Sequence, residues 1–85
     1  MAALTEELAG LVEAVVTPLI EHPDELEVTA VEPEDDDVVV VEIRVNPDDA
    51  GKVIGRQGRV IKAIRTLARA AASAQDTPVE VELID

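Results

Sequence analysis

The sequence contains no cysteine and no phenylalanine, tryptophan or tyrosine. Without cysteine, disulfides and zinc–thiolate sites are excluded. Without aromatic rings the chain cannot stack nucleobases as RRM and OB-fold domains do, and its core must consist of Val, Leu, Ile and Ala. A thin aliphatic core in a chain of 85 residues is of the kind that a partner subunit often stabilises. We therefore expect a small domain that is assisted by oligomerisation.

Long apolar segments are also missing. No apolar run approaches the roughly 18 residues that would suggest a membrane span, and the N-terminal stretch MAALTEELAG lacks a positively charged leader. The phosphate-binding pattern GxxxxGK(S/T) and the dinucleotide fingerprint GxGxxG are absent as well. We expect one cytoplasmic domain over residues 1–85, with no membrane insertion, no cofactor and no catalytic activity.

Charge is unevenly distributed along the chain. The formal net charge is -12, yet residues 50–75 contain six of the seven Lys and Arg residues and no acid. The other segments contain all nineteen acids and a single basic residue, Arg44. A basic cluster can be a solvated helix face as well as a binding site. Charge alone therefore leaves both interpretations open.

Three segments show the three- and four-residue periodicity of helices. The first, residues 4–19, should stop or kink near Pro18. The second begins after the N-cap residue Asn46 and ends at Gly55, and the third covers residues 59–74. The expected buried stripes are Leu4, Leu8, Leu11, Val12, Val15 and Leu19 in the first helix, and Val60, Ile64, Leu67, Ala68 and Ala71 in the third.

Three further segments read as strands. Residues 26–32 and 79–84 alternate apolar and polar side chains, as half-buried strands do, whereas residues 38–45 begin apolar on both faces, as a central strand does. The first two strands should pair as an antiparallel hairpin. The second and third, which are joined through helices, should be parallel. The predicted fold is α+β, in the order α-β-β-α-α-β, with a three-stranded mixed sheet and the helices on one face.

The stretch IGRQGRVI, residues 54–61, joins the second and third helices. Gly55 and Gly58 allow the backbone to turn sharply, and the following helix then begins with its amide groups at the gap. That end attracts phosphate, and Arg56 and Arg59 add positive charge to it. The same motif could be a corner that needs glycine for geometry only. Because neither intervening residue is acidic, we favour phosphate binding.

Residues 53–64, VIGRQGRVIKAI, resemble the VIGxxGxxI signature of KH domains, in which a GXXG loop clamps single-stranded nucleic acid. The helix-first order matches the bacterial type II arrangement. The resemblance extends over almost the whole chain to the KhpA family of small bacterial KH-domain proteins. Carried over by position, it implies that Gly55, Arg56, Gln57 and Gly58 form the clamp and that Ile54 and Ile61 line the base groove.

The resemblance implies an RNA-binding protein, an RNA chaperone or post-transcriptional regulator with a role in cell-envelope homeostasis and cell-length control. It also implies a homodimer, a heterodimer with the larger KH-domain protein KhpB/Jag, or both. This chain differs from the family in its acidity, because EPEDDD at residues 32–37 fills a loop that can border the RNA groove. These acids could confine RNA to a narrow channel by repelling phosphate elsewhere.

The remaining charged residues are assigned more simply. Among the basic residues around the loop, we expect RNA contacts from Lys52, Arg56, Arg59 and Lys62, and a solvated exterior for Arg65 and Arg69. Arg44 could reach the groove or pair with neighbouring acids. The run Asp35-Asp36-Asp37 lacks the glycine and distal glutamate of a calcium loop and reads as a solvated turn, and His22 reads as a turn residue.

Two functional hypotheses follow. The first is non-catalytic binding of single-stranded RNA at Gly55 to Gly58. The second is a protein-interaction or dimerisation module in which the helix after the loop contacts a KH-domain partner that supplies most of the RNA affinity. The second rests on the alanines at positions 63, 70, 71 and 74.

Overall fold

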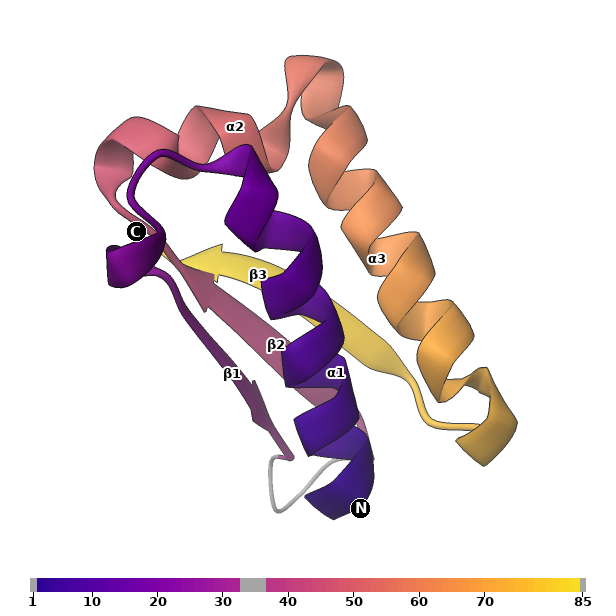
Figure 1. Ribbon diagram of the computed structural model, residues 1–85. Helices are drawn as coiled ribbons and strands as arrows, with labels where there is room; N and C mark the ends of the chain where they lie inside the picture. Colours follow the sequence, from indigo (N-terminus) through magenta and orange to yellow (C-terminus); the bar gives the residue numbers. More distant parts are fainter. Residues whose placement is uncertain (1, 33–36, 85) are drawn as a thin grey trace.

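The computed structural model describes residues 2–32 and 37–84. Its elements follow the predicted order α-β-β-α-α-β (Figure 1). The helices are α1 (Ala2–Val16), α2 (Ala50–Ile54) and α3 (Arg59–Ala72), and the strands are β1 (Glu27–Val31), β2 (Val39–Arg44) and β3 (Val79–Ile84). Short 3-10 turns connect them: η1 (Thr17–Leu19), η2 (Pro23–Glu25), η3 (Pro47–Asp49), η4 (Arg56–Gly58) and η5 (Ser73–Gln75).

The three strands form one mixed sheet in the order β1-β2-β3. The β1–β2 pair is antiparallel, with Glu27 opposite Arg44. The β2–β3 pair is parallel, with Val39 opposite Val79. Both pairings confirm the topology predicted from the sequence, including the central place of the valine-rich strand.

The helices cover one face of this sheet (Figure 1). Helices α1 and α3 contact each other and also contact strands β1 and β3, respectively. Their buried side chains meet those of the sheet in one aliphatic core, and Asp49 is the one buried polar residue among those that the structure describes. The core includes Leu4, Leu8, Val12 and Val16 of α1, Val39, Val41 and Ile43 of β2, Ile61, Ile64, Ala68 and Ala72 of α3, and Val79 and Val81 of β3.

The predicted end of the first helix is confirmed, because α1 stops at Val16 and Pro18 lies in the following 3-10 turn η1. The predicted stripe is wrong at that end. Leu19 is 40% exposed, and Ile20 is buried in its place. The tighter winding of a 3-10 turn shifts the side chains after Val16 out of the helical period. The periodicity of α1 therefore cannot be extended through Pro18.

The buried face of α3 differs from the predicted one. Leu67 is 46% exposed and Ala71 is exposed, whereas Ile61 and Ala72 are buried. The helix is apolar on two adjacent faces, so the period alone could not distinguish which face packs inward. The consequence is an outward-facing apolar stripe, whose exposed members are Ala63, Leu67, Ala70 and Ala71 of α3 and Ala74 of η5.

The second helical segment begins as predicted after Asn46, with the 3-10 turn η3 at Pro47 leading into α2 at Ala50. Asn46 caps the segment, its side-chain oxygen accepting a hydrogen bond from the Asp48 N–H at 2.8 Å. Of the acidic stretch at residues 32–37, residues 33–36 lie outside the described residues, so the predicted border of the groove and the turn at Asp35 and Asp36 are not described. No helix in the described ranges is long and apolar enough to cross a membrane.

Candidate nucleic-acid interface

Gly55 ends α2 in a conformation that other residues rarely adopt. Its φ of 76° and ψ of 170° fall in a region populated almost only by glycine. Its N–H still closes the helix by donating to the Gly51 carbonyl at 2.8 Å. A Cβ at this position would overlap the side chain of Val60 and lie 2.8 Å from the Val60 backbone nitrogen. Glycine is therefore required here for both conformation and close approach.

The next turn of the loop is left-handed. Gln57 and Gly58 have φ values of 58° and 74°, and the Gly58 N–H donates to the Gly55 carbonyl at 3.1 Å. A Cβ on Gly58 would meet nothing closer than 4.0 Å, so this glycine serves conformation and not packing. The turn reverses the chain and starts α3 at Arg59. The N-terminus of α3 consequently lies beside the loop, and the Arg59 N–H donates to the Arg56 carbonyl.

Three cations lie at the loop and at the start of α3. Arg56, Arg59 and Lys62 are exposed, and none of them forms an ion pair within the described part of the chain. The Arg59 guanidinium donates a hydrogen bond to the Gln57 side-chain oxygen at 3.1 Å, which links the left-handed turn to the first turn of α3. These three cations and the helix N-terminus form a site suited to anionic phosphodiester groups.

The two isoleucines assigned to the base groove occupy different environments. Ile54 is 42% exposed at the end of α2, whereas Ile61 is 8% exposed and belongs to the core. Ile54 offers an accessible aliphatic surface next to the loop. Ile61 packs in the core and leaves little surface accessible to a base.

Lys52 lies one turn before Gly55 but is held by carboxylates. Its ammonium nitrogen is 3.0 Å from Glu21 Oε1 and 3.5 Å from Asp49 Oδ1. The hydrogen bond to Glu21 is the main reason that the pKa of Lys52 is raised. Unlike the loop cations, Lys52 must exchange an existing partner if it is to contact phosphate.

Asp49 is a buried charged residue that the sequence did not single out. Its carboxylate accepts hydrogen bonds from the N–H groups of Glu21 and His22 at 3.0 and 2.9 Å, and it lies 3.1 Å from His22 Nδ1. Burial disfavours the ionised form, but the two backbone donors and the His22 ring outweigh it and lower the pKa of Asp49 to about 2. The same contact raises the pKa of His22. Asp49 thereby fastens the start of α2 to the turn after α1.

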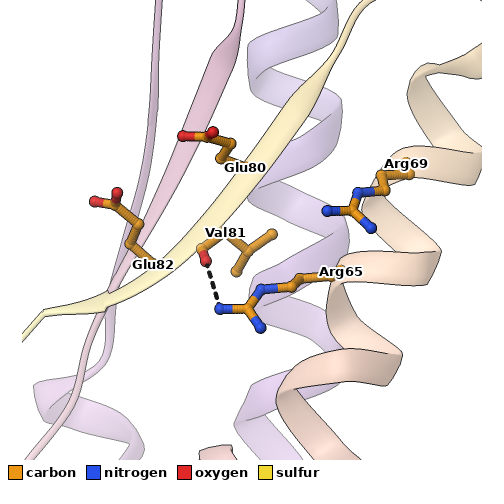
Figure 2. Close-up of a pocket in the computed structure, with 5 residues that line it drawn as sticks. All are labelled: Arg65, Arg69, Glu80, Val81 and Glu82. Atoms are coloured by element: carbon orange, nitrogen blue, oxygen red, sulfur yellow. Dashed lines mark hydrogen bonds between the residues drawn. The ribbon is translucent and has the colours of Figure 1, made fainter.

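Arg65 and Arg69, expected to be solvated, border a pocket of about 320 Å³ between α3 and β3. Figure 2 shows both guanidinium groups pointing from α3 toward the strand, and Arg65 Nη2 donates to the Val81 carbonyl at 3.4 Å. Glu80 and Glu82 also line this pocket but project from the other side of the strand. A basic stripe therefore continues along α3 from the loop through Arg59, Lys62, Arg65 and Arg69.

Arg44 pairs with acids on the face of the sheet that the helices leave uncovered. Its Nη1 lies 3.8 Å from Glu27 Oε1 and 3.7 Å from Glu42 Oε1. In the same register Glu42 is opposite Glu82 on β3. Of the two interpretations left open for Arg44, the structure supports pairing with neighbouring acids.

The sequence of this chain is similar to those of known KH-domain proteins. The family model described as "KhpA/KhpB, KH domain" matches residues 9–83. An RNA-binding protein KhpA from Halalkalibacterium halodurans is 44% identical over 75 residues, covering 88% of this chain and 96% of the relative. The protein of the same name from Bacillus subtilis is 40% identical over 80 residues, covering 94% of this chain and 96% of the relative.

Among solved structures, two of the protein Era share the fold. Aquifex aeolicus Era bound to GDP·AlF4⁻ aligns with a TM-score of 0.62 at 24% identity. Era in complex with MgGDPNP and a segment of 16S ribosomal RNA aligns with a TM-score of 0.63, also at 24% identity. Each alignment covers 94% of this chain but only 30% of Era. This likeness confirms the predicted fold class.

Proposed function

Because this chain belongs to the KhpA/KhpB KH-domain family, we propose that it binds single-stranded RNA, without catalysis, at the loop Gly55–Gly58. The supporting observation is the loop itself, in which two positive-φ glycines place the start of α3 beside cations that have no acidic partner in the described ranges. Relatives named RNA-binding protein KhpA cover most of the chain at 40 to 45% identity.

In this proposal the phosphates lie on the loop and the start of α3. Backbone N–H groups, Arg56 and Arg59 contact the phosphodiester oxygens. Gln57 faces the RNA backbone, and Lys62 contacts a further phosphate. The exposed side chain of Ile54, with the edge of Ile61, provides an aliphatic surface for a base. No aromatic stacking is required, which suits a chain that contains no aromatic residue.

The finer role also rests on the family resemblance. We propose a cytoplasmic RNA chaperone or post-transcriptional regulator that acts as a homodimer or together with the larger KH-domain protein KhpB/Jag, and that contributes to cell-envelope homeostasis and cell length. The family model that matches this chain covers the KH domains of both KhpA and KhpB, which supports a shared mode of RNA recognition.

The experiment replaces both intervening loop residues, Arg56→Asp and Gln57→Asp, and measures binding to fluorescently labelled single-stranded RNA by anisotropy. Both side chains are exposed, so the double variant should fold as the wild type does by circular dichroism. We expect the wild type to bind RNA and the variant to lose binding. RNA affinity that is unchanged in a folded double variant would falsify the proposal.

A second candidate function is supported by the exposed apolar stripe of α3. Leu67 is 46% exposed and is flanked by exposed alanines, whose small side chains allow a second helix to approach closely. In this alternative α3 docks on another KH-domain protein or on a second copy, and the partner supplies most of the RNA affinity.

The substitution Leu67→Glu distinguishes the two candidate functions, because it alters the apolar stripe of α3 and leaves the loop Gly55–Gly58 unchanged. The alternative predicts that sedimentation or co-purification detects an assembly in the wild type and that the variant loses it. A wild type that remains monomeric at high micromolar concentration and that captures no purified KH-domain partner would exclude it.

A further inference from the structure

Four charged or titratable side chains form a cluster near the start of α2, outside the loop Gly55–Gly58. Glu21 and His22 come from the turn after α1, Asp49 comes from η3, and Lys52 comes from α2. Asp49 is fully buried and has its two oxygens fixed by the backbone N–H groups of Glu21 and His22. Asp49 is therefore a fixed feature of the fold, whereas Glu21 and Lys52 are partly exposed to solvent.

Lys52 is held within this cluster by two carboxylates of different character. Asp49 is internal and cannot move away, while Glu21 is 75% exposed and can release the ammonium group into solvent. The contact with Glu21 is also the shorter of the two, at 3.0 Å against 3.5 Å. The Glu21 contact is thus the one that can exchange.

The position of Lys52 next to the loop makes that exchange relevant to RNA. It precedes Gly55 by three residues, which is nearly one helical turn, and its side chain is 40% exposed. The other cations flanking Gly55 to Gly58, which are Arg56, Arg59 and Lys62, have no acidic partner among the residues described. Lys52 differs from them in forming ion pairs, with Glu21 and Asp49.

We propose that Glu21 competes with RNA phosphate for Lys52, so that this ion pair is a built-in restraint on RNA affinity. This inference rests on the proposed function of the loop. In the free protein Lys52 is paired with Glu21. In the complex Lys52 turns to a phosphate, and the exposed Glu21 carboxylate returns to water. The affinity of the domain is lowered by the stability of the pair that must be broken.

The test is a double-mutant cycle on Glu21 and Lys52, read by RNA anisotropy. Glu21→Gln should tighten binding about two- to fivefold, the range that corresponds to breaking an exposed ion pair. Glu25→Gln is the matched control, because it removes an equal charge from an exposed residue of the same turn that contacts Asn46 and not Lys52. It should change affinity less than Glu21→Gln does.

The cycle is completed in a Lys52→Gln background, where Glu21→Gln should have no more effect than Glu25→Gln. Three results would each overturn the inference. Glu21→Gln could increase RNA affinity even in the Lys52→Gln background, it could increase affinity by no more than Glu25→Gln does, or it could reduce affinity. The last result would mean that Glu21 positions Lys52 for RNA instead of competing for it.

A second measurement separates this inference from the proposed function. NMR titration of the Lys52 side chain without RNA should show that its raised pKa falls toward the ordinary value in Glu21→Gln. An unchanged Lys52 pKa would overturn the competing pair even if RNA binds. Absence of RNA binding in both the wild type and Glu21→Gln would instead overturn the function of the loop, and the restraint with it.

Discussion

The two ends of the short helix α2 differ in how their charges are satisfied. At its beginning the buried Asp49 accepts hydrogen bonds from two backbone groups, and Lys52 is paired with Glu21. At its end Arg56 and Arg59 are exposed and have no acidic partner in the part of the chain that the structure describes. The first end is built to hold the fold together, whereas the second leaves positive charge available for a ligand.

This difference explains how a chain of net charge -12 can present a site for an anionic polymer. Most acids in the part of the chain that the structure describes are exposed to solvent, as on the open side of the sheet. The basic stripe begins only after Gly55. In the proposed function, repulsion by the acidic surface would direct RNA to the loop.

The largest predicted effect concerns the two glycines of the loop. Gly55→Ala would place a Cβ 2.8 Å from the Val60 nitrogen in a conformation that alanine does not adopt. We expect it to reduce the free energy of unfolding by about 3 kcal/mol or more. Gly58→Ala meets open space and should cost only about 1 kcal/mol, a Tm decrease of roughly 4–8 °C.

Thermal unfolding followed by far-UV circular dichroism measures both variants, since the chain has no Trp or Tyr fluorescence. Equal losses of stability in the two alanine variants would contradict the different roles assigned to Gly55 and Gly58.

The next effect concerns adjacent aspartates, Asp49 and Asp48. The folded-state pKa of Asp49 is lowered from the ordinary 3.8 to about 2. Its stabilisation is therefore present above pH 3.8 and is lost as pH falls through about 2. Asp49→Asn should lower Tm by several degrees at neutral pH, and its difference from wild type should shrink as pH falls from about 4 to 2.

The matched control is Asp48→Asn, which removes a charge from an exposed neighbouring residue. A pH series of Tm values for the wild type and both variants provides the measurement. If Asp49→Asn and Asp48→Asn unfold with the same midpoint at neutral pH, Asp49 does not fasten α2 as described.

The smallest effect compares a free cation with a paired one. Arg59→Gln removes one proposed phosphate contact, so the slope of log affinity against log salt should become shallower by about 0.7. Arg44→Gln removes the same charge from the open side of the sheet, where the arginine lies 3.7 Å from Glu42, and should leave the slope unchanged. Identical salt-dependence slopes for the two variants would mean that RNA affinity depends only on the net charge of the protein.

Much of the fold could be predicted because its local signals agree. The apolar run of β2 identified the central strand, Asn46 identified the start of the second helical segment, and Gly55 identified its end. The buried face of α3 could not be predicted, because Leu67 and Ala71 extend its apolar pattern onto an exposed face. Periodicity shows that a helix is amphipathic, but the packing partners decide which apolar face is covered.

The loop motif could also be predicted from Gly55 and Gly58. The contacts of the nearby residues Lys52 and Asp49 could not be predicted. Lys52 reads in the sequence as one more free cation, but the fold brings Glu21 from a distant turn to within 3.0 Å of it. Asp49 reads as an ordinary first-turn acid, and its burial against residues 21 and 22 depends on tertiary packing. The signal in the sequence was the placement of the only histidine, His22, in an acidic turn.

The most direct test of the account is an amide NMR titration of the ¹⁵N-labelled protein with a short single-stranded RNA. The account predicts that the largest shifts cluster at residues 54–62 and continue along α3, with little change at Glu27, Glu42 and Arg44 on the open side of the sheet. Shifts centred on that acidic side, or none at the loop when RNA is bound, would contradict it.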